Sequence, residues 1–99
     1  MTTIYPEDIE HIKEKEKTLQ IIDLRSSSNY KKSHIKDAIS IPRDAFIINI
    51  KKLIKEGTIL FYCNEGIESD NIALYIEKKY KKCKTLSLFG GYKNYLEAM

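Results

Sequence analysis

The segment FYCNEGIES, at residues 61–69, places a lone cysteine directly after a run of apolar residues. Cys63 is followed three positions later by Gly66, a residue that allows a loop to curl tightly. A thiolate is a nucleophile, and the unpaired backbone amides of a loop and of the helix turn after it stabilise an anion at the sulfur. The segment therefore predicts a nucleophilic Cys63. The structural alternative is a small buried residue at the end of a strand.

Strand-like and helix-like segments alternate along the chain and predict how Cys63 is positioned. Apolar, β-branched runs predict strands near Ile4 and Tyr5 and at 18–24, 38–41, 58–62 and 85–89. Apolar residues at helical spacing predict helices from Pro6 and over 44–56 and 69–80. The polar segment 26–37 is long enough for a short helix, and a helical tail follows Gly91. This alternation is typical of an α/β fold with a largely parallel sheet covered on both faces. Ligands bind such sheets beyond the carboxyl ends of the strands, where we expect Cys63.

Length and composition restrict the class of protein. The 99 residues, of which 42% are hydrophobic, suit a single domain spanning 1–99. The net charge of +3 is spread along the chain, so nucleic-acid binding is not indicated. The sequence contains neither an apolar run of about 18 residues nor an apolar signal region, which predicts a cytoplasmic protein without a membrane span. Two cysteines without metal-ligand spacing predict neither a disulfide nor a metal site.

Three segments, in this order, resemble the signatures of the rhodanese-like family. The first, IIDLRSSSNYKKSHIKDAISIP, matches the family pattern at Asp23, Arg25, His34, Ile35, Ala38, Ile41 and Pro42. The second, ILFYCNEGIES, resembles the active-site segment and matches it at Cys63 and Gly66. The third, LFGGYKNY, resembles the closing turn and its aromatic helix at Leu88, Gly90, Gly91 and Tyr95. The resemblance spans nearly the whole chain.

The resemblance implies a three-layer fold with about five mainly parallel strands, flanked by helices on both faces. It also implies a sulfurtransferase in which Cys63 accepts a sulfane sulfur, forms a persulfide and passes the sulfur to a thiophilic acceptor. The loop that binds the persulfide would comprise Asn64, Glu65, Gly66, Ile67, Glu68 and Ser69. No cofactor is required, because converging amide dipoles can stabilise the anion without a metal. The donor would be thiosulfate, a small persulfide or a persulfide-carrying protein, and the oligomeric state stays open.

Two acidic residues distinguish this loop from the family pattern. Glu68 stands at the last loop position, where sulfurtransferases of the family often have Arg, Thr or Ser, and Glu65 adds a second carboxylate. Each carboxylate about 6 to 8 Å from a bound dianion opposes it by roughly 2 kcal/mol per charge pair at an effective dielectric near ~20. Thiosulfate is therefore predicted to be a poor donor. Glu68 and Asp70 also suit the N-terminus of the following helix, and the acidic loop keeps a noncatalytic binding or sensing module as the alternative function.

Asp23, Arg25 and His34 are predicted to support the site. Asp23 and Arg25 end a strand, and an ion pair or backbone hydrogen bonds that hold the turn are favoured over a catalytic role. His34 falls in a turn and is interpreted as a structural histidine. Cys83 precedes its strand whereas Cys63 follows its own, so a parallel sheet would separate the two sulfurs by on the order of 15 Å, too far for a disulfide.

A cysteine phosphatase or an arsenate reductase is a further class with a related architecture. Enzymes of that class close the cysteine loop with an arginine, which binds the oxyanion through two parallel hydrogen bonds. The sixth residue after Cys63 is Ser69, and no arginine occurs anywhere in 64–99. The sequence therefore argues against phosphatase or arsenate chemistry.

Overall fold

A five-stranded parallel sheet forms the centre of the computed structural model, which describes residues 1–99. The strands are β1 (Thr2–Ile4), β2 (Leu19–Asp23), β3 (Ile39–Ser40), β4 (Gly57–Tyr62) and β5 (Cys83–Leu88). Their order in the sheet is β1-β5-β4-β2-β3, and every neighbouring pair is parallel. The predicted α/β fold with a mainly parallel sheet is confirmed. The central strand is β4, as expected for the most apolar run.

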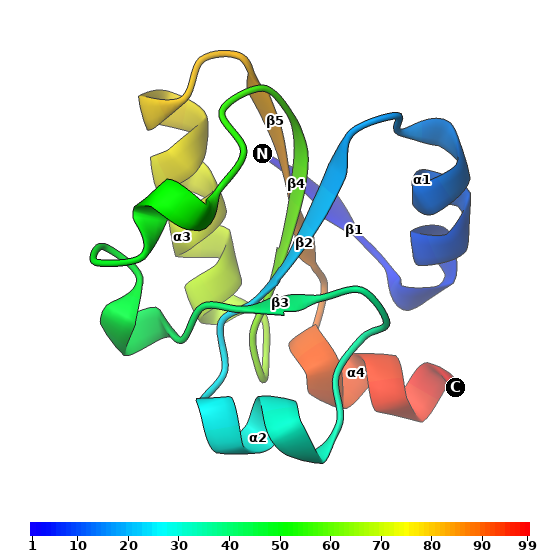
Figure 1. Ribbon diagram of the computed structural model, residues 1–99. Coiled ribbons are helices and arrows are strands. Elements are labelled where there is room, and N and C mark those ends of the chain that lie inside the picture. Colours follow the sequence, from blue (N-terminus) through cyan, green and yellow to red (C-terminus); the bar gives the residue numbers. More distant parts are fainter.

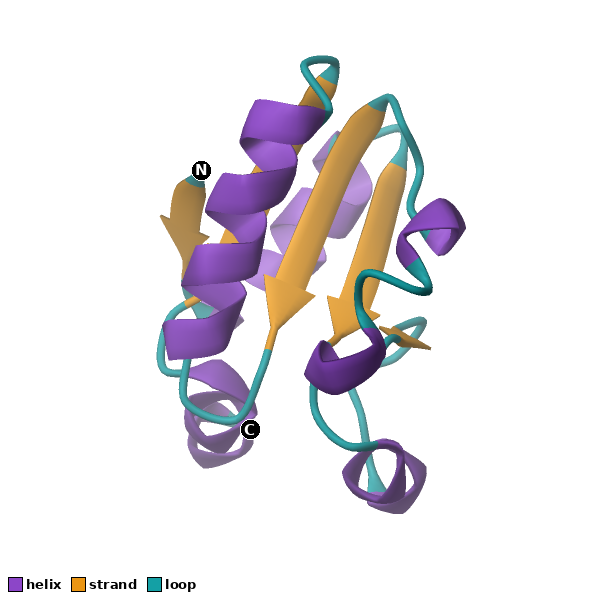
Figure 2. Ribbon diagram, turned by 90° about the vertical axis from the view of Figure 1, so that its left-hand side faces the viewer, coloured by secondary structure: helices purple, strands orange, loops and turns teal.

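Helices cover both faces of the sheet. On one face lie α3 (Ile67–Lys79) and two single 3-10 turns, η2 (Arg43–Ala45) and η3 (Ile50–Lys52). On the other face lie α1 (Ile9–Lys15), which follows the turn η1 (Pro6–Asp8), and α4 (Gly91–Ala98) (Figure 1). The short helix α2 (Ser27–Lys32) lies near the carboxyl ends of the strands, and Figure 2 shows α3 in front of the sheet with α1 and α4 behind it.

The sheet separates two apolar cores. Twelve buried residues, Ile22, Phe61 and Ile76 among them, form the core on the α3 side. Ten buried residues, including Leu60 and Tyr62, form the core on the α1 and α4 side. Consecutive residues of β4 enter opposite cores because successive side chains of a strand point to opposite faces. Burial on both faces explains why the strand reads as an unbroken apolar run.

The continuous helix predicted over 44–56 is wrong, because the segment forms only η2 and η3 with irregular chain between and after them. Gln20 of β2 accounts for where η3 ends. Its side-chain amide donates to the carbonyl of Lys52 at 2.8 Å and accepts from the amide of Ile54 at 2.9 Å. These bonds hold the intervening Leu53 in an extended conformation. A polar side chain on a neighbouring strand therefore overrides the helical spacing of the apolar residues, which still face the core.

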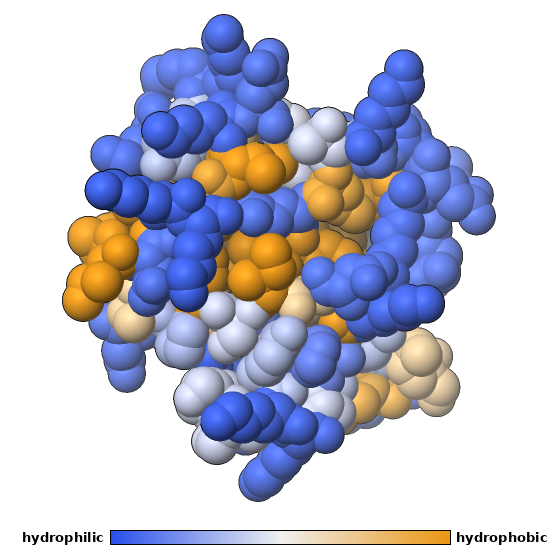
Figure 3. Space-filling model, in the orientation of Figure 1, coloured by the Kyte–Doolittle hydropathy of each residue, from blue (hydrophilic) through white to orange (hydrophobic).

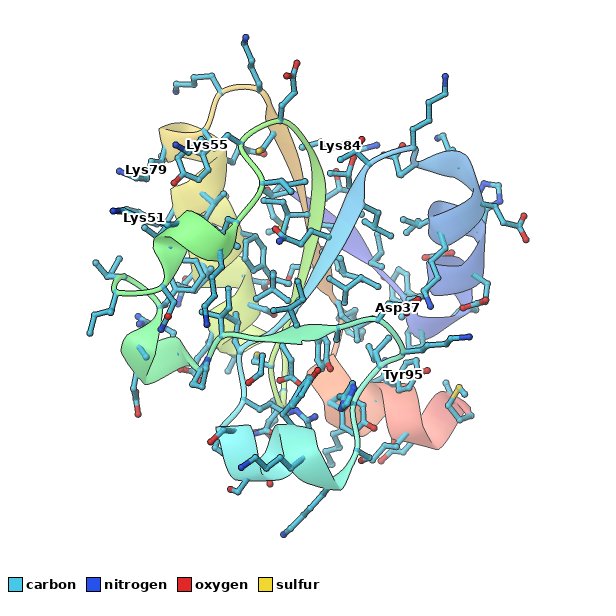
Figure 4. The ribbon with its side chains drawn as sticks, in the orientation of Figure 1. Asp37, Lys51, Lys55, Lys79, Lys84 and Tyr95 are labelled. Atoms are coloured by element: carbon cyan, nitrogen blue, oxygen red, sulfur yellow. The ribbon has the colours of Figure 1, made fainter.

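The surface shows how charge and apolar area are distributed around the sheet. The segment between η2 and η3 exposes Ile47 and Ile48, whose exposed fractions are 63% and 84%, and Figure 3 shows apolar surface there. Lys51, Lys55 and Lys79 extend outward on the side of the molecule where η3 and α3 lie (Figure 4). None of the helices is long and apolar enough to cross a membrane.

Candidate active site

Cys63 lies directly after β4, at the carboxyl edge of the sheet, with an exposed fraction of 3%. The backbone amides of Gly66 and Ser69 donate to its Sγ atom at 3.1 and 3.4 Å. Ser69 Oγ lies 3.5 Å from the same sulfur. Amide donors that converge on one atom favour negative charge there. The surroundings of Cys63 are therefore suited to a thiolate or to an anion bonded to the sulfur.

The helix after the loop begins two residues earlier than the predicted start at 69. Gly66 precedes α3 with a φ of 98°, a conformation that L side chains rarely adopt, and the helix starts at Ile67. Ser69 is therefore the third residue of the helix, and its hydroxyl donates to the carbonyl of Gly66 at 3.1 Å. The amides of Ile67 and Glu68 lie in the first turn, where helical geometry gives them no acceptor within the helix. Of the predicted loop, only Gly66 and Ser69 bind the sulfur directly.

An open cavity of about 270 Å³ is lined by Cys63, Asn64, Glu65, Ile67 and Glu68. Both carboxylates predicted to oppose an anion therefore face the same space as Cys63. Arg43 of η2 lies close by, with its Nε 3.9 Å from Glu68 Oε2. Both side chains of this pair are about half exposed, so solvent weakens the pairing. The acidic character of the cavity is reduced but not removed.

A tight turn at Gly90 and Gly91 holds the loop from behind. The first amides of α4, those of Tyr92 and Lys93, donate to the carbonyls of Cys63 and Asn64 at 2.8 and 3.2 Å. Gly91 has a φ of 66°, and a Cβ atom there would lie 2.4 Å from the carbonyl oxygen of Asn64. No side chain fits between the turn and the loop. Gly91 is thus required because α4 must approach the backbone of Cys63 and Asn64 closely.

A buried polar network links the ends of β2 and β4 beside this loop. Asp23, which is fully buried, forms an ion pair with Arg25 through Oδ2 and Nη2 at 2.7 Å. The Tyr62 hydroxyl donates to Asp23 Oδ2 at 2.7 Å and accepts from the amide of Ile35 at 3.1 Å. Burial, together with the hydrogen bond to Asp23, raises the pKa of Tyr62 far above its usual value, so this residue stays a neutral donor. The expected ion pair is present and holds the turn.

The remaining predicted residues lie away from the sulfur. His34 is exposed; its Nδ1 lies 2.9 Å from the carbonyl oxygen of Tyr30, and the two rings stack with centroids 3.8 Å apart. Cys83 begins β5 and pairs in register with Gly57, the first residue of β4, so the two cysteines are at opposite ends of the sheet. Burial, with the nearby charge of Glu56, raises the pKa of the Cys83 thiol. Both cysteines are free.

Two residues near the sulfur were not singled out from the sequence. Ser87 of β5 lies with its Oγ 2.8 Å from Ser69 Oγ, which fixes the rotamer of that residue under the cysteine. Its signal in the sequence is one polar residue inside the apolar run TLSLF. Arg43 comes three residues after the end of β3 at Ser40, and its Nε lies 3.9 Å from Glu68 Oε2 at the same edge of the sheet. No group of three or more His, Cys, Asp or Glu side chains is placed to bind a metal ion.

Comparison with known proteins agrees with this geometry. Residues 6–98 match the family model of the rhodanese-like domain, so the chain belongs to the rhodanese-like family. It is 29% identical over 82 residues to the thiosulfate sulfurtransferase GlpE of Coxiella burnetii, covering 82% of this chain and 75% of that protein.

Solved structures of the same family share the fold. A rhodanese-related protein from Thermoplasma volcanium superposes with a TM-score of 0.84 at 16% identity, over 99% of this chain and 93% of that one. A rhodanese-like domain protein from Staphylococcus aureus gives a TM-score of 0.81 at 22% identity, over 96% and 91% of the two chains. The three-layer arrangement implied by the sequence resemblance is thus confirmed.

We predict that Tyr62→Phe lowers the free energy of unfolding by about 1–3 kcal/mol, because it leaves the buried amide of Ile35 without an acceptor and removes one donor from Asp23. Urea denaturation measures the change. Tyr75→Phe is the matched control, since Tyr75 is 43% exposed and its hydroxyl makes no hydrogen bond, and it should shift stability by less than about 0.5 kcal/mol. Equal effects of the two variants would contradict the role of the network.

We predict that Gly91→Ala destabilises the fold by about 2 kcal/mol or more and also changes the alkylation rate of Cys63, because the new methyl group must displace the loop carbonyls. Gly90→Ala is the control: its φ of 71° is similar, but the added Cβ meets the side chain of Asn94 instead. It should lower stability while leaving the alkylation rate of Cys63 near that of the unmodified protein. Iodoacetamide labelling with peptide mass spectrometry, beside thermal denaturation, separates the two outcomes.

Proposed function

We propose that the protein is a sulfurtransferase in which Cys63 carries the transferred sulfur as a persulfide. The observation that supports it most is the pair of amides, from Gly66 and Ser69, that donate to Cys63 Sγ beside an open cavity. Membership of the rhodanese-like family and the similarity to a thiosulfate sulfurtransferase support the same reaction. The buried thiol of Cys83 has no comparable donors and takes no part.

The proposed reaction consists of two nucleophilic displacements. The Cys63 thiolate attacks the sulfane sulfur of the donor, and the bond between that sulfur and the rest of the donor breaks. The electron pair leaves with sulfite when the donor is thiosulfate, or with a thiolate when it is a persulfide. An acceptor thiolate then attacks the outer sulfur, and Cys63 departs as a thiolate. The amides of Ile67 and Glu68, which have no acceptor within the helix, would donate to the outer sulfur in the proposed intermediate, so its charge would be stabilised without a cofactor.

The acidic cavity bears on the choice of donor. Thiosulfate would bring two negative charges into the space lined by Glu65 and Glu68, whereas a persulfide brings at most one at the reacting sulfur. A persulfide on a partner protein with a basic surface would be attracted by the same carboxylates. We therefore propose persulfides, small or protein-bound, as better donors than thiosulfate.

A noncatalytic binding or sensing module is the second candidate function, and the two carboxylates beside Cys63 are the observation that favours it. The two functions differ in what they require of the sulfur. A binding module would keep its partner and its cellular role after Cys63→Ser, whereas a sulfurtransferase would lose its activity while keeping its fold.

We predict that incubating the reduced protein with thiosulfate or a persulfide donor adds about 32 Da, the mass of one sulfur atom, at Cys63, and that dithiothreitol removes it. Intact-mass and peptide mass spectrometry locate the adduct. Cys83→Ser is the matched control and should acquire the same adduct, while Cys63→Ser should acquire none. If every donor leaves the mass of the Cys83→Ser protein unchanged, the proposed function is wrong.

We predict that Glu68→Gln lowers KM for thiosulfate about threefold or more, because it removes one carboxylate from the cavity of Cys63. The effect should shrink as ionic strength rises. Asp70→Asn is the control, since Asp70 also lies in the first turn of α3 but does not line that cavity. Steady-state kinetics in which both variants lower KM equally would assign the effect to the charge of the helix end instead.

A further inference from the structure

A second cavity, of about 300 Å³, lies beside the cavity of Cys63 and has the opposite charge. Its lining includes Arg25, Asn29, Lys32, Asn64, Tyr92 and Lys93. Lys32 comes from α2 and Lys93 from α4, so two helices that are far apart in sequence bring their cations to one space. No carboxylate lines this cavity, and neither lysine has a carboxylate partner within 4.0 Å.

Arg25 lines this cavity and is held in place by the buried polar network. Its side chain is buried, with an exposed fraction of 6%, and its Cζ lies 4.0 Å from the ring centroid of Tyr92. The Nε and Nη2 atoms donate to Asp23, and Nη2 also donates to the carbonyl of Ser33. The third nitrogen, Nη1, makes no hydrogen bond within the protein. Since Asp23 balances the charge of Arg25, the two lysines supply the net charge of the cavity, and Nη1 of Arg25 keeps its capacity to donate a hydrogen bond.

Asn64 connects the two cavities, because it lines both the acidic space around Cys63 and the basic space between α2 and α4. In thiosulfate the sulfonate group is bonded directly to the sulfane sulfur, so its charge must enter beside Glu65 and Glu68. A donor whose anionic group lies several bonds from the reacting sulfur can instead place that group across Asn64, among the cations. The arrangement of charge therefore discriminates between donors by the distance between sulfur and anion.

Building on the proposed function, we propose that the basic cavity binds the carboxylate of a small thiol persulfide, R–S–SH, and so selects this class of sulfur donor. The Cys63 thiolate attacks the outer sulfur, the sulfur–sulfur bond of the donor breaks, and its electron pair leaves as R–S⁻, while the outer sulfur and its proton stay on Cys63 as Cys63–S–SH. The carboxylate remains beside Lys32 and Lys93 throughout, so the reaction needs no further reactant.

The test compares persulfides of mercaptopropionate and mercaptohexanoate with persulfides of the corresponding uncharged amides. Mass spectrometry follows the rate of sulfur addition to Cys63. In the double variant Lys32→Gln, Lys93→Gln we expect the rate of sulfur addition from at least one carboxylate donor to fall about fivefold or more. A decrease of this size corresponds to the loss of two solvent-exposed charge contacts. The rate with the amides should not change. Lys31→Gln, on the same helix but outside the cavity, is the control and should alter neither rate.

Equal slowing of carboxylate and amide donors in the double variant, or no slowing of either, overturns the assignment of the cavity. A binding measurement separates this result from a failure of sulfur transfer itself. Methylthiohexanoate cannot transfer sulfur, yet it should shift the backbone NMR signals of Asn64 and Lys93 in the unmodified protein and not in the double variant. Absence of those shifts also rejects the site. Shifts without any sulfur addition from any donor would keep the carboxylate site and reject the proposed sulfurtransferase activity.

Discussion

The geometry of the site depends on two backbone amides, those of Gly66 and Ser69, which donate to the sulfur of Cys63. Their convergence requires the chain to reverse within three residues of Cys63, and Gly66 permits this because its φ of 98° is accessible to glycine. It also requires α3 to begin at once, so that the amide of Ser69 in the first turn faces back toward Cys63. A helix that began at Ser69 itself would place that amide elsewhere. The geometry at the sulfur is thus fixed by main chain rather than by flexible side chains.

Three groups of charges surround the sulfur of Cys63 at increasing distance. The amide dipoles act at the shortest range and favour negative charge on Cys63. The carboxylates of Glu65 and Glu68 act from the walls of the cavity, and Arg43 offsets part of their effect. On the other side of Asn64, the cavity lined by Lys32 and Lys93 is again positively charged. In the proposed function, such a site would stabilise a charged intermediate and disfavour small, highly charged reagents, because the two effects come from groups at different distances from the sulfur.

Much of this arrangement could be predicted from the sequence, since it depends on local pattern. The sequence alone predicts that Cys63 lies at the carboxyl end of a strand, because it follows the apolar run 58–62 and precedes Gly66 by three residues. The single helix over 44–56 could not be rejected, because the deciding contact comes from Gln20, more than thirty residues away. The sequence also could not predict that Lys32 and Lys93 line one cavity, because this depends on how α2 and α4 pack at the carboxyl edge of the sheet. Both features depend on contacts between residues far apart in the sequence, which the local spacing of apolar residues does not reveal.

The first turn of α4 is bonded to the carbonyls of Cys63 and Asn64, with Gly91 packed directly against them. A movement of α4 would therefore also move the backbone of Cys63 and Asn64. A ligand or neighbouring molecule that tilts the helix by a small angle would pull on the same peptide units that orient Sγ, and it would do so without entering either cavity. If Cys63 reacts as proposed, its reactivity would therefore respond to forces on a solvent-facing helix.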